Sequence, residues 1–102
     1  MAQSFYPAKS EKVRWIQRSS LGVLLDPDTR RYYTLNGVAM CIWNMCDGVR
    51  DIRQLAQELQ RTYRVTMPRA LKDITMLVAY WSKRGLVVPH KSNRGFYPRE
   101  KA

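Results

Sequence analysis

Apolar and polar residues alternate in short runs through the first third of the chain, as they do in half-buried strands. Residues 13–18 alternate in this way, residues 21–25 form a short β-prone run, and residues 31–35 are rich in aromatic and β-branched side chains. Residues 26–29, Asp-Pro-Asp-Thr, form a turn sequence, because Pro27 presets φ and both aspartates accept from nearby N–H groups. The pattern predicts a meander of three antiparallel strands.

From residue 36 onward, apolar residues recur at helical spacing. Asn36 is a suitable N-cap for a helix over residues 37–45. A second helix opens at Asp51, which forms a capping box with the glutamine three residues later. A third has Pro68 in its first turn and Gly85 just past its end. The order of elements is therefore three strands and then three helices, with a brief return of the chain over residues 86–88.

The 102 residues are one domain's worth of chain, and their charge is uneven. Eighteen Lys and Arg against eight Asp and Glu give a net charge of +10, which favours an acidic partner. We expect a basic N-terminal arm at residues 1–12, a folded domain at residues 13–88 and a basic C-terminal tail at residues 89–102. No apolar run approaches the roughly 20 residues needed to cross a bilayer. Without a signal-peptide pattern at the start, we expect a cytoplasmic protein with no membrane partner.

The residues needed for most catalytic and metal sites are scarce. His90 is the single histidine, and Cys41 and Cys46 are five residues apart, so they lie on different sides of one helix. A zinc site would need further ligands, and both thiols are better explained as small apolar residues. We therefore predict no cofactor, no metal and no enzymatic activity.

The third predicted helix has two apolar faces. One is a wide core-facing arc, made of Met67, Ala70, Leu71, Ile74, Leu77, Val78 and Trp81. A second stripe, roughly opposite, has an apolar middle with cations at both ends: Arg69, Lys72, Asp73, Met76, Tyr80 and Lys83. A solvated face is normally polar throughout. The stripe therefore either packs against another part of the chain or forms one wall of a groove that takes apolar side chains of an acidic ligand.

The last strand of the meander, Arg31–Leu35, is a candidate for the other wall of that groove. A terminal strand leaves N–H and C=O groups unpaired at the sheet edge, where an extended peptide can add as a further strand. Tyr33 and Leu35 share one face of this strand, and Tyr32 and Thr34 share the other. Because Leu35 precedes the first helix, we expect Tyr33 to line the inner side.

Four short motifs, in this order and spacing, carry a resemblance to a known family. They are Leu-Asn at residues 35–36, Asp-Gly at residues 47–48, Asp73 inside the third helix and Arg-Gly-Leu at residues 84–86. With them, residues 13–88 resemble the PqqD-like proteins, the recognition elements that bind leader peptides of ribosomally made natural products. The resemblance implies an α+β, winged-helix-like fold, in which a three-stranded antiparallel sheet is followed by three helices.

The resemblance also implies a function and a set of contacts. The protein would bind the leader of a precursor peptide without catalysis and present it to a modifying enzyme or leader peptidase, for example in a lasso-peptide or radical-SAM pathway. The leader would pair with Arg31, Tyr32, Tyr33, Thr34 and Leu35, and its side chains would contact Arg69, Lys72, Met76, Tyr80 and Lys83. Asp73 matches the family's aspartate, and would contact the peptide or tie structurally to Arg31 or a backbone N–H.

The main alternative is a winged-helix protein that binds DNA or RNA. A basic domain with three helices fits it, since Lys and Arg on phosphates supply affinity. Against it, the strands precede the helices, and the stripe on the third helix lacks an Asn, Gln or Arg cluster for reading bases. The open strand edge would also permit a dimer, so the oligomeric state stays open.

Overall fold

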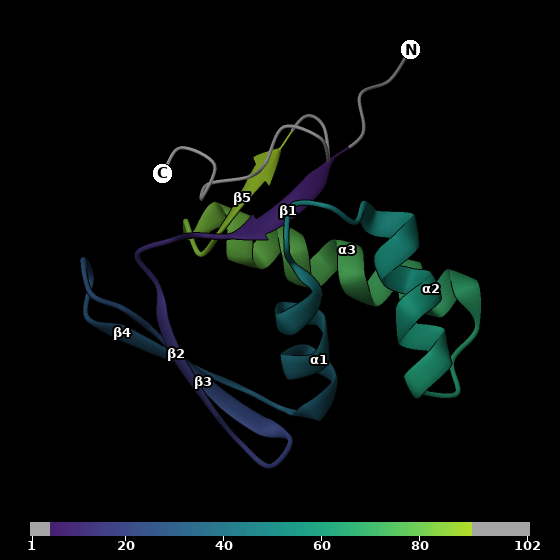
Figure 1. Cartoon of the computed structure of the whole chain (residues 1–102), viewed down its shortest axis with the longest axis horizontal. Helices are drawn as coiled ribbons and strands as arrows, with labels where there is room; N and C mark the ends of the chain where they lie inside the picture. Colours follow the sequence, from purple (N-terminus) through teal and green to yellow (C-terminus); the bar gives the residue numbers. More distant parts are fainter. Residues whose placement is uncertain (1–4, 91–102) are drawn as a thin grey trace.

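The computed structural model describes residues 5–90, which form two antiparallel sheets and three helices (Figure 1). The strands are β1 (Tyr6–Lys9), β2 (Arg14–Arg18), β3 (Leu21–Asp26), β4 (Arg31–Leu35) and β5 (Val87–His90). The helices are α1 (Gly37–Met45), α2 (Ile52–Thr62) and α3 (Met67–Lys83). One sheet has the order β2-β3-β4, and β1 pairs with β5 in a separate ribbon. No helix within the described residues is long and apolar enough to cross a membrane.

The predicted meander and the three helices after it are confirmed, and with them the α+β fold. Strands β2, β3 and β4 pair in sequence order, with Leu24 opposite Tyr33 in the register between β3 and β4. Burial alternates along β3, so that Gly22, Leu24 and Asp26 face inward. Asp26 holds the turn that follows, because its carboxylate accepts from the N–H of Asp28 at 3.0 Å. This turn directs β4 back along β3.

The helix boundaries follow the capping signals in the sequence. The Asn36 side chain accepts from the N–H of Ala39 at 2.9 Å at the start of α1. Asp51 and Gln54 form both bonds of the capping box at the start of α2. Gly85 has a φ of 73° just after α3, the left-handed conformation that favours glycine at a helix end.

The core lies between the β2-β3-β4 sheet and the helices, with α1 at its centre (Figure 1). Trp43 of α1 and Trp81 of α3 are fully buried, and their rings meet edge to face at 5.3 Å between centroids. Met40 of α1 packs against Gly22 of β3, where a Cβ would overlap with the Met40 Sδ atom. A side chain at position 22 would therefore force the buried Met40 to move.

The N-terminal arm is shorter than predicted, because Tyr6–Lys9 form strand β1. Pro7 and Ala8 are buried, and β1 pairs with β5 along its whole length. The Lys9 N–H donates to the Cys46 carbonyl at 3.1 Å, and the Gly48 N–H donates to the Pro7 carbonyl at 2.9 Å. These bonds fix β1 to the loop between α1 and α2. The predicted C-terminal tail begins with the last two residues of β5, and its remainder, like residues 1–4, lies outside the described residues.

The prediction that residues 13–18 form a half-buried strand is correct for the strand and wrong for its burial. Val13 is buried, but every residue of β2 is exposed. Trp15 is 43% exposed and touches the core only through its ring, which meets Trp43 edge to face at 6.3 Å between centroids. The reason is position, since β2 is an edge strand and one face of its sheet is left uncovered.

Candidate binding groove

A continuous groove runs between β4 and α3 and over the first turn of α1. It consists of three adjoining depressions of about 420, 580 and 540 Å³. The first two share Asn36, Ala39, Leu77 and Tyr80, and the second and third share Val38 and Asp73. We call it the β4–α3 groove. It begins at the edge of β4 and ends at the loop between α2 and α3.

Strand β4 presents a free edge along one side of the groove. Its only strand neighbour among residues 5–90 is β3, so alternate residues of β4 direct their N–H and C=O groups to the open side. Tyr33 and Leu35 face inward, and Tyr33 lines the groove as expected. Tyr32, which is 68% exposed, and Thr34 point to the outer face of the sheet. The edge therefore offers backbone pairing beside an aromatic wall.

The wall formed by α3 is apolar and held in place. Met76 is 60% exposed and Tyr80 is 44% exposed, both high for large apolar side chains. The Tyr80 ring meets Tyr33 edge to face at 6.4 Å, which joins the helix to the strand. The Arg84 guanidinium lies 3.6 Å from the Tyr80 ring centroid and donates to the Tyr80 carbonyl at 3.1 Å. Contacts with two neighbours thus hold the Tyr80 ring in place before any ligand binds.

The middle of the groove has an apolar floor supplied by α1. Val38, Ala39 and Ile42 line it beneath Met76 and Leu77 of α3. The cap that begins α1 determines which side chains lie here, because it fixes where the first helical turn starts. A depression of this size and lining suits an apolar side chain.

The far end of the groove is charged. Arg64 and Arg69 line it together with Asp73, whose carboxylate oxygens lie 3.2 and 3.3 Å from the Arg69 Nε. Asp73 therefore pairs with a residue one turn earlier on its own helix, and not with Arg31, which was one of the alternatives that the sequence left open. The pair is substantially exposed, so it contributes less than about 1 kcal/mol to stability. Its side chains are free to exchange partners with a ligand.

The groove brings together most of the predicted contact residues, but not all of them. Lys72 and Lys83 are exposed on α3 without lining any of the three depressions. Arg31 is exposed at the start of β4, opposite Asp26, and also lies outside the lining. Eleven residues that line the groove were not predicted as contacts: Asn36, Val38, Ala39, Ile42, Leu59, Tyr63, Arg64, Val65, Thr66, Leu77 and Trp81. Arg84 borders the groove at Tyr80 and was not predicted either. The exposed stripe of α3 does not reveal these residues, because they come from α1 and its cap, from α2 and the loop after it, from the core-facing arc of α3 or from the residue after that helix.

Both cysteine thiols are poor nucleophiles. Burial raises the pKa of Cys46 to about 12, and its thiol donates to the Ile42 carbonyl at 3.3 Å. Burial also raises the pKa of the half-buried Cys41. Within residues 5–90 no cluster of three or more His, Cys, Asp or Glu side chains is placed to hold a metal ion. The chemistry of the groove is that of binding surfaces, with backbone groups, aromatic rings and a charged end.

A family comparison agrees with this geometry. The sequence profile of the family described as Coenzyme PQQ synthesis protein D (PqqD) matches residues 22–87, more than half of the chain. The chain belongs to the PqqD family. The matched residues include β4, α1 and α3, which form the groove. The resemblance inferred from the sequence is confirmed, while no curated protein matches the chain.

Two solved structures are similar to this member of the PqqD family. One is "TbiB1 in Complex with the TbiA(beta) Leader Peptide", with a TM-score of 0.72 and 19% identity, covering 88% of this chain and 98% of that one. The other is "Lasso peptide synthetase B1 complexed with the leader peptide", with a TM-score of 0.72 and 26% identity, covering 82% of this chain and 99% of that one. The likeness to the first structure shows a shared fold. In both comparisons the match extends over nearly the whole of the solved chain.

Proposed function

We propose that this protein binds the leader segment of a ribosomally synthesised precursor peptide by strand addition at β4. The observation that carries the proposal is the free edge of β4 facing the exposed apolar wall of α3. Membership of the PqqD family and two similar structures that hold leader peptides support it. The similarity to the lasso peptide synthetase B1 favours a lasso-peptide pathway over a radical-SAM pathway.

The groove suits a peptide with a particular order of side chains. Backbone bonds to β4 would supply sequence-independent affinity, and alternate side chains would supply specificity. An apolar residue fits the middle depression beside Met76 and Tyr80, and an acidic residue fits the end that holds Arg64 and Arg69. A charge-assisted hydrogen bond to either arginine is worth about 1.5–3 kcal/mol where it is partly desolvated.

In this proposal the protein performs no reaction and delivers its ligand to a modifying enzyme or a leader peptidase in the cytoplasm. The groove is open and lined by apolar, aromatic and arginine side chains, which suits holding a peptide rather than cleaving it. Nucleic acid is the weaker candidate, because the middle of the groove wall is apolar. A groove that bound the phosphates of a nucleic acid would carry Lys or Arg side chains in the middle of its wall.

Strand addition is tested with two N-methylated versions of one leader peptide, taken from the precursor encoded beside this gene. One version carries N-methyl groups on one set of alternate residues, and the second carries them on the other set. Only one set donates to β4 in a ladder, so one version should lose at least about tenfold in affinity and the other should bind like the unmodified peptide. Equal binding by both versions, or no binding of the unmodified leader, would contradict the proposal.

A further inference from the structure

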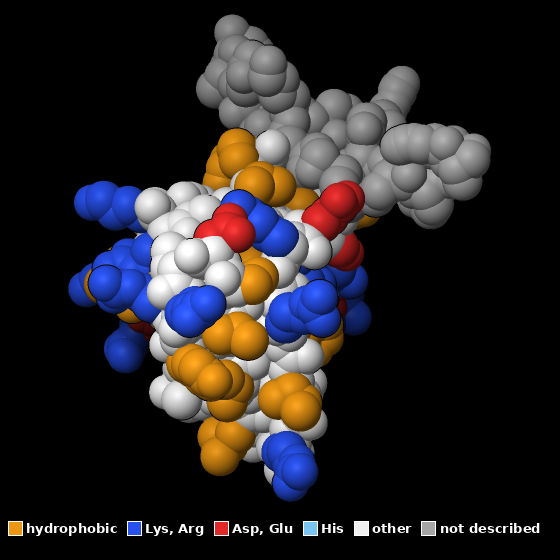
Figure 2. Space-filling view, turned by 90° about the vertical axis from the view of Figure 1, so that its left-hand side faces the viewer, with side chains coloured by type: hydrophobic (Ala, Val, Ile, Leu, Met, Phe, Trp, Pro, Cys, Tyr) orange, Lys and Arg blue, Asp and Glu red, His pale blue; other side chains and the backbone are white. Residues whose placement is uncertain are grey.

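The outer face of the β2-β3-β4 sheet is an exposed apolar surface. Register and alternation place eight side chains on it: Arg14, Ile16, Arg18, Leu21, Val23, Leu25, Tyr32 and Thr34. Ile16 is 59% exposed, Leu21 is 58% exposed and Tyr32 is the most exposed of the three. Figure 2 shows the molecule from the left-hand side of Figure 1, where this sheet lies. In this view hydrophobic side chains gather over the lower part of the molecule, with Lys and Arg side chains beside and below them. The solvated face of an antiparallel sheet is normally polar, and this one is not.

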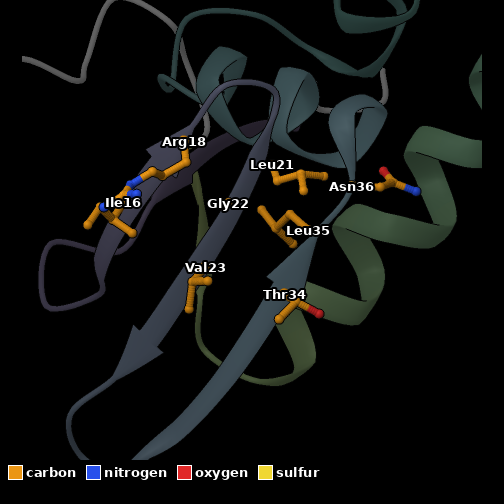
Figure 3. Close-up of a pocket in the computed structure, with 8 residues that line it drawn as sticks. All are labelled: Ile16, Arg18, Leu21, Gly22, Val23, Thr34, Leu35 and Asn36. Atoms are coloured by element: carbon orange, nitrogen blue, oxygen red, sulfur yellow. The ribbon is translucent and has the colours of Figure 1, made fainter.

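The surface is also hollowed. A depression of about 380 Å³ lies toward the end of the sheet that holds the β2–β3 turn and the start of α1, lined mainly by apolar residues from all three strands. In Figure 3 Ile16 and Arg18 stand on β2 at one side, Val23 lies between, and Thr34 stands on β4 at the other. Gly22 adds no side chain to this region. Shape and chemistry together are those of an interface centre, which is apolar and excludes water.

The flanks of this surface indicate the charge of its occupant. Arg14 and Arg18 stand at the two ends of β2, beside Leu25 and Leu21 in the register. Neither arginine takes part in an ion pair among the described residues. A second copy of this chain would bring the same arginines and another net charge of +10 to the contact, so charge disfavours it. An apolar patch bordered by Asp and Glu on another protein is the complementary surface.

The outer face is continuous with the β4–α3 groove, because β4 contributes side chains to both. Tyr32 and Thr34 of β4 point to the outer face while Tyr33 points into the groove. A leader added beside β4 would direct its own alternate side chains onto the outer face and widen it by one strand.

We propose that this outer face, completed by the bound leader, docks the modifying enzyme through an apolar patch with an acidic border. The inference rests on the proposed function and adds the surface by which this protein contacts the modifying enzyme. Because the leader contributes to the docking surface, leader and enzyme each raise the affinity of the protein for the other by the same factor.

The test compares two pairs of variants of the full chain. The double variant Ile16→Thr/Leu21→Thr removes apolar area from the outer face with residues that strands tolerate. Its control is Val49→Thr, an exposed apolar side chain in the loop between α1 and α2. The double variant Arg14→Glu/Arg18→Glu reverses the flanking charge, and its control is Arg53→Glu on the exposed side of α2.

For each variant, calorimetry measures the affinity for the leader and then, with leader bound and without it, the affinity for the modifying enzyme encoded beside this gene. Both double variants should lose at least about tenfold in enzyme affinity, while the controls stay within about twofold of the wild type. Leader affinity should be unchanged in all four, which separates this inference from the proposed function and shows that the variants fold.

Three outcomes would overturn the inference. The first is enzyme affinity within about twofold of the wild type in both double variants. The second is enzyme affinity that does not change when the leader is added. The third is another occupant: self-association of the wild type in sedimentation that Ile16→Thr/Leu21→Thr abolishes, or binding of anionic phospholipid vesicles or a DNA duplex that Arg14→Glu/Arg18→Glu abolishes. If the wild type fails to bind the leader at all, the proposed function fails with it.

Discussion

Replacing Met76 with alanine isolates the apolar contribution of the groove. Met76 is the most exposed large apolar side chain on the α3 wall, and Ala keeps the helix because it is the better helix former. Burying a whole Met side chain is worth about 1.5–3 kcal/mol. With 60% of Met76 still exposed in the free protein, a leader that covers it gains about 1–2 kcal/mol. Met76→Ala should therefore weaken leader binding about 5- to 30-fold.

The assay is the dissociation constant of the leader at low and at high salt. The ratio between Met76→Ala and the wild type should be the same at both, because apolar burial is not screened by ions. Thr75→Ala is the matched control, since Thr75 is exposed on α3 but faces away from the groove, toward β5 and the start of α2. It should leave the affinity unchanged, and neither variant should change the free energy of unfolding by more than about 0.5 kcal/mol.

Two results would refute this reasoning. A loss of affinity for Met76→Ala that disappears at high salt would mean that the contact is electrostatic. An equal loss for Thr75→Ala would mean that both changes act on the helix as a whole and not on a groove contact.

Three further predictions follow from named contacts. Arg69→Ala should weaken leader binding most at low salt, because an exposed charge is screened at high salt, and a loss that is equal at both salts would contradict this. Gly22→Ala should destabilise the fold by about 1–3 kcal/mol in urea unfolding, because the new Cβ meets the buried Met40. Gly37→Ala is the control, since a Cβ has room there and should stabilise α1 by about 0.4–1 kcal/mol. Similar effects of the two changes would refute the packing argument. As the pH rises above about 9, the wild type should lose unfolding free energy relative to Cys46→Ala. The reason is that the pKa of Cys46 is about 12 in the folded protein and 9.0 in an unfolded chain, so the unfolded chain loses the thiol proton first. Parallel pH profiles of the two proteins would contradict this prediction.

Local sequence patterns predicted the elements that position the groove. Alternation over residues 31–35 placed Tyr33 on the inner side, and the capping residues Asn36 and Asp51 marked where α1 and α2 begin. The two apolar arcs of α3 followed from its periodicity, which is why Met76 and Tyr80 were identified as one wall. Each of these features is determined by residues within a few positions of one another.

What the sequence did not predict depends on contacts between distant residues. Strand β1 contains Pro7 and Ala8 and shows no alternation. It forms because β5 returns some 80 residues later to pair with it and because the loop between α1 and α2 adds further backbone bonds. The salt bridge of Asp73 depends on which rotamer Arg69 adopts, and several partners were possible. The exposure of β2 shows the same limit, since alternation tells which side chains share a face but not whether anything covers that face.

The central claim is that the leader adds as a strand beside β4, and amide hydrogen exchange measured by NMR tests it most directly. With the leader bound, alternate amides of Arg31–Leu35 should become protected, and chemical shifts should change along the α3 stripe from Arg69 to Tyr80. A short DNA duplex should cause neither effect. Protection of the other free edge, Arg14–Arg18, with β4 unchanged, or changes in α3 with the duplex and none with the leader, would contradict the account.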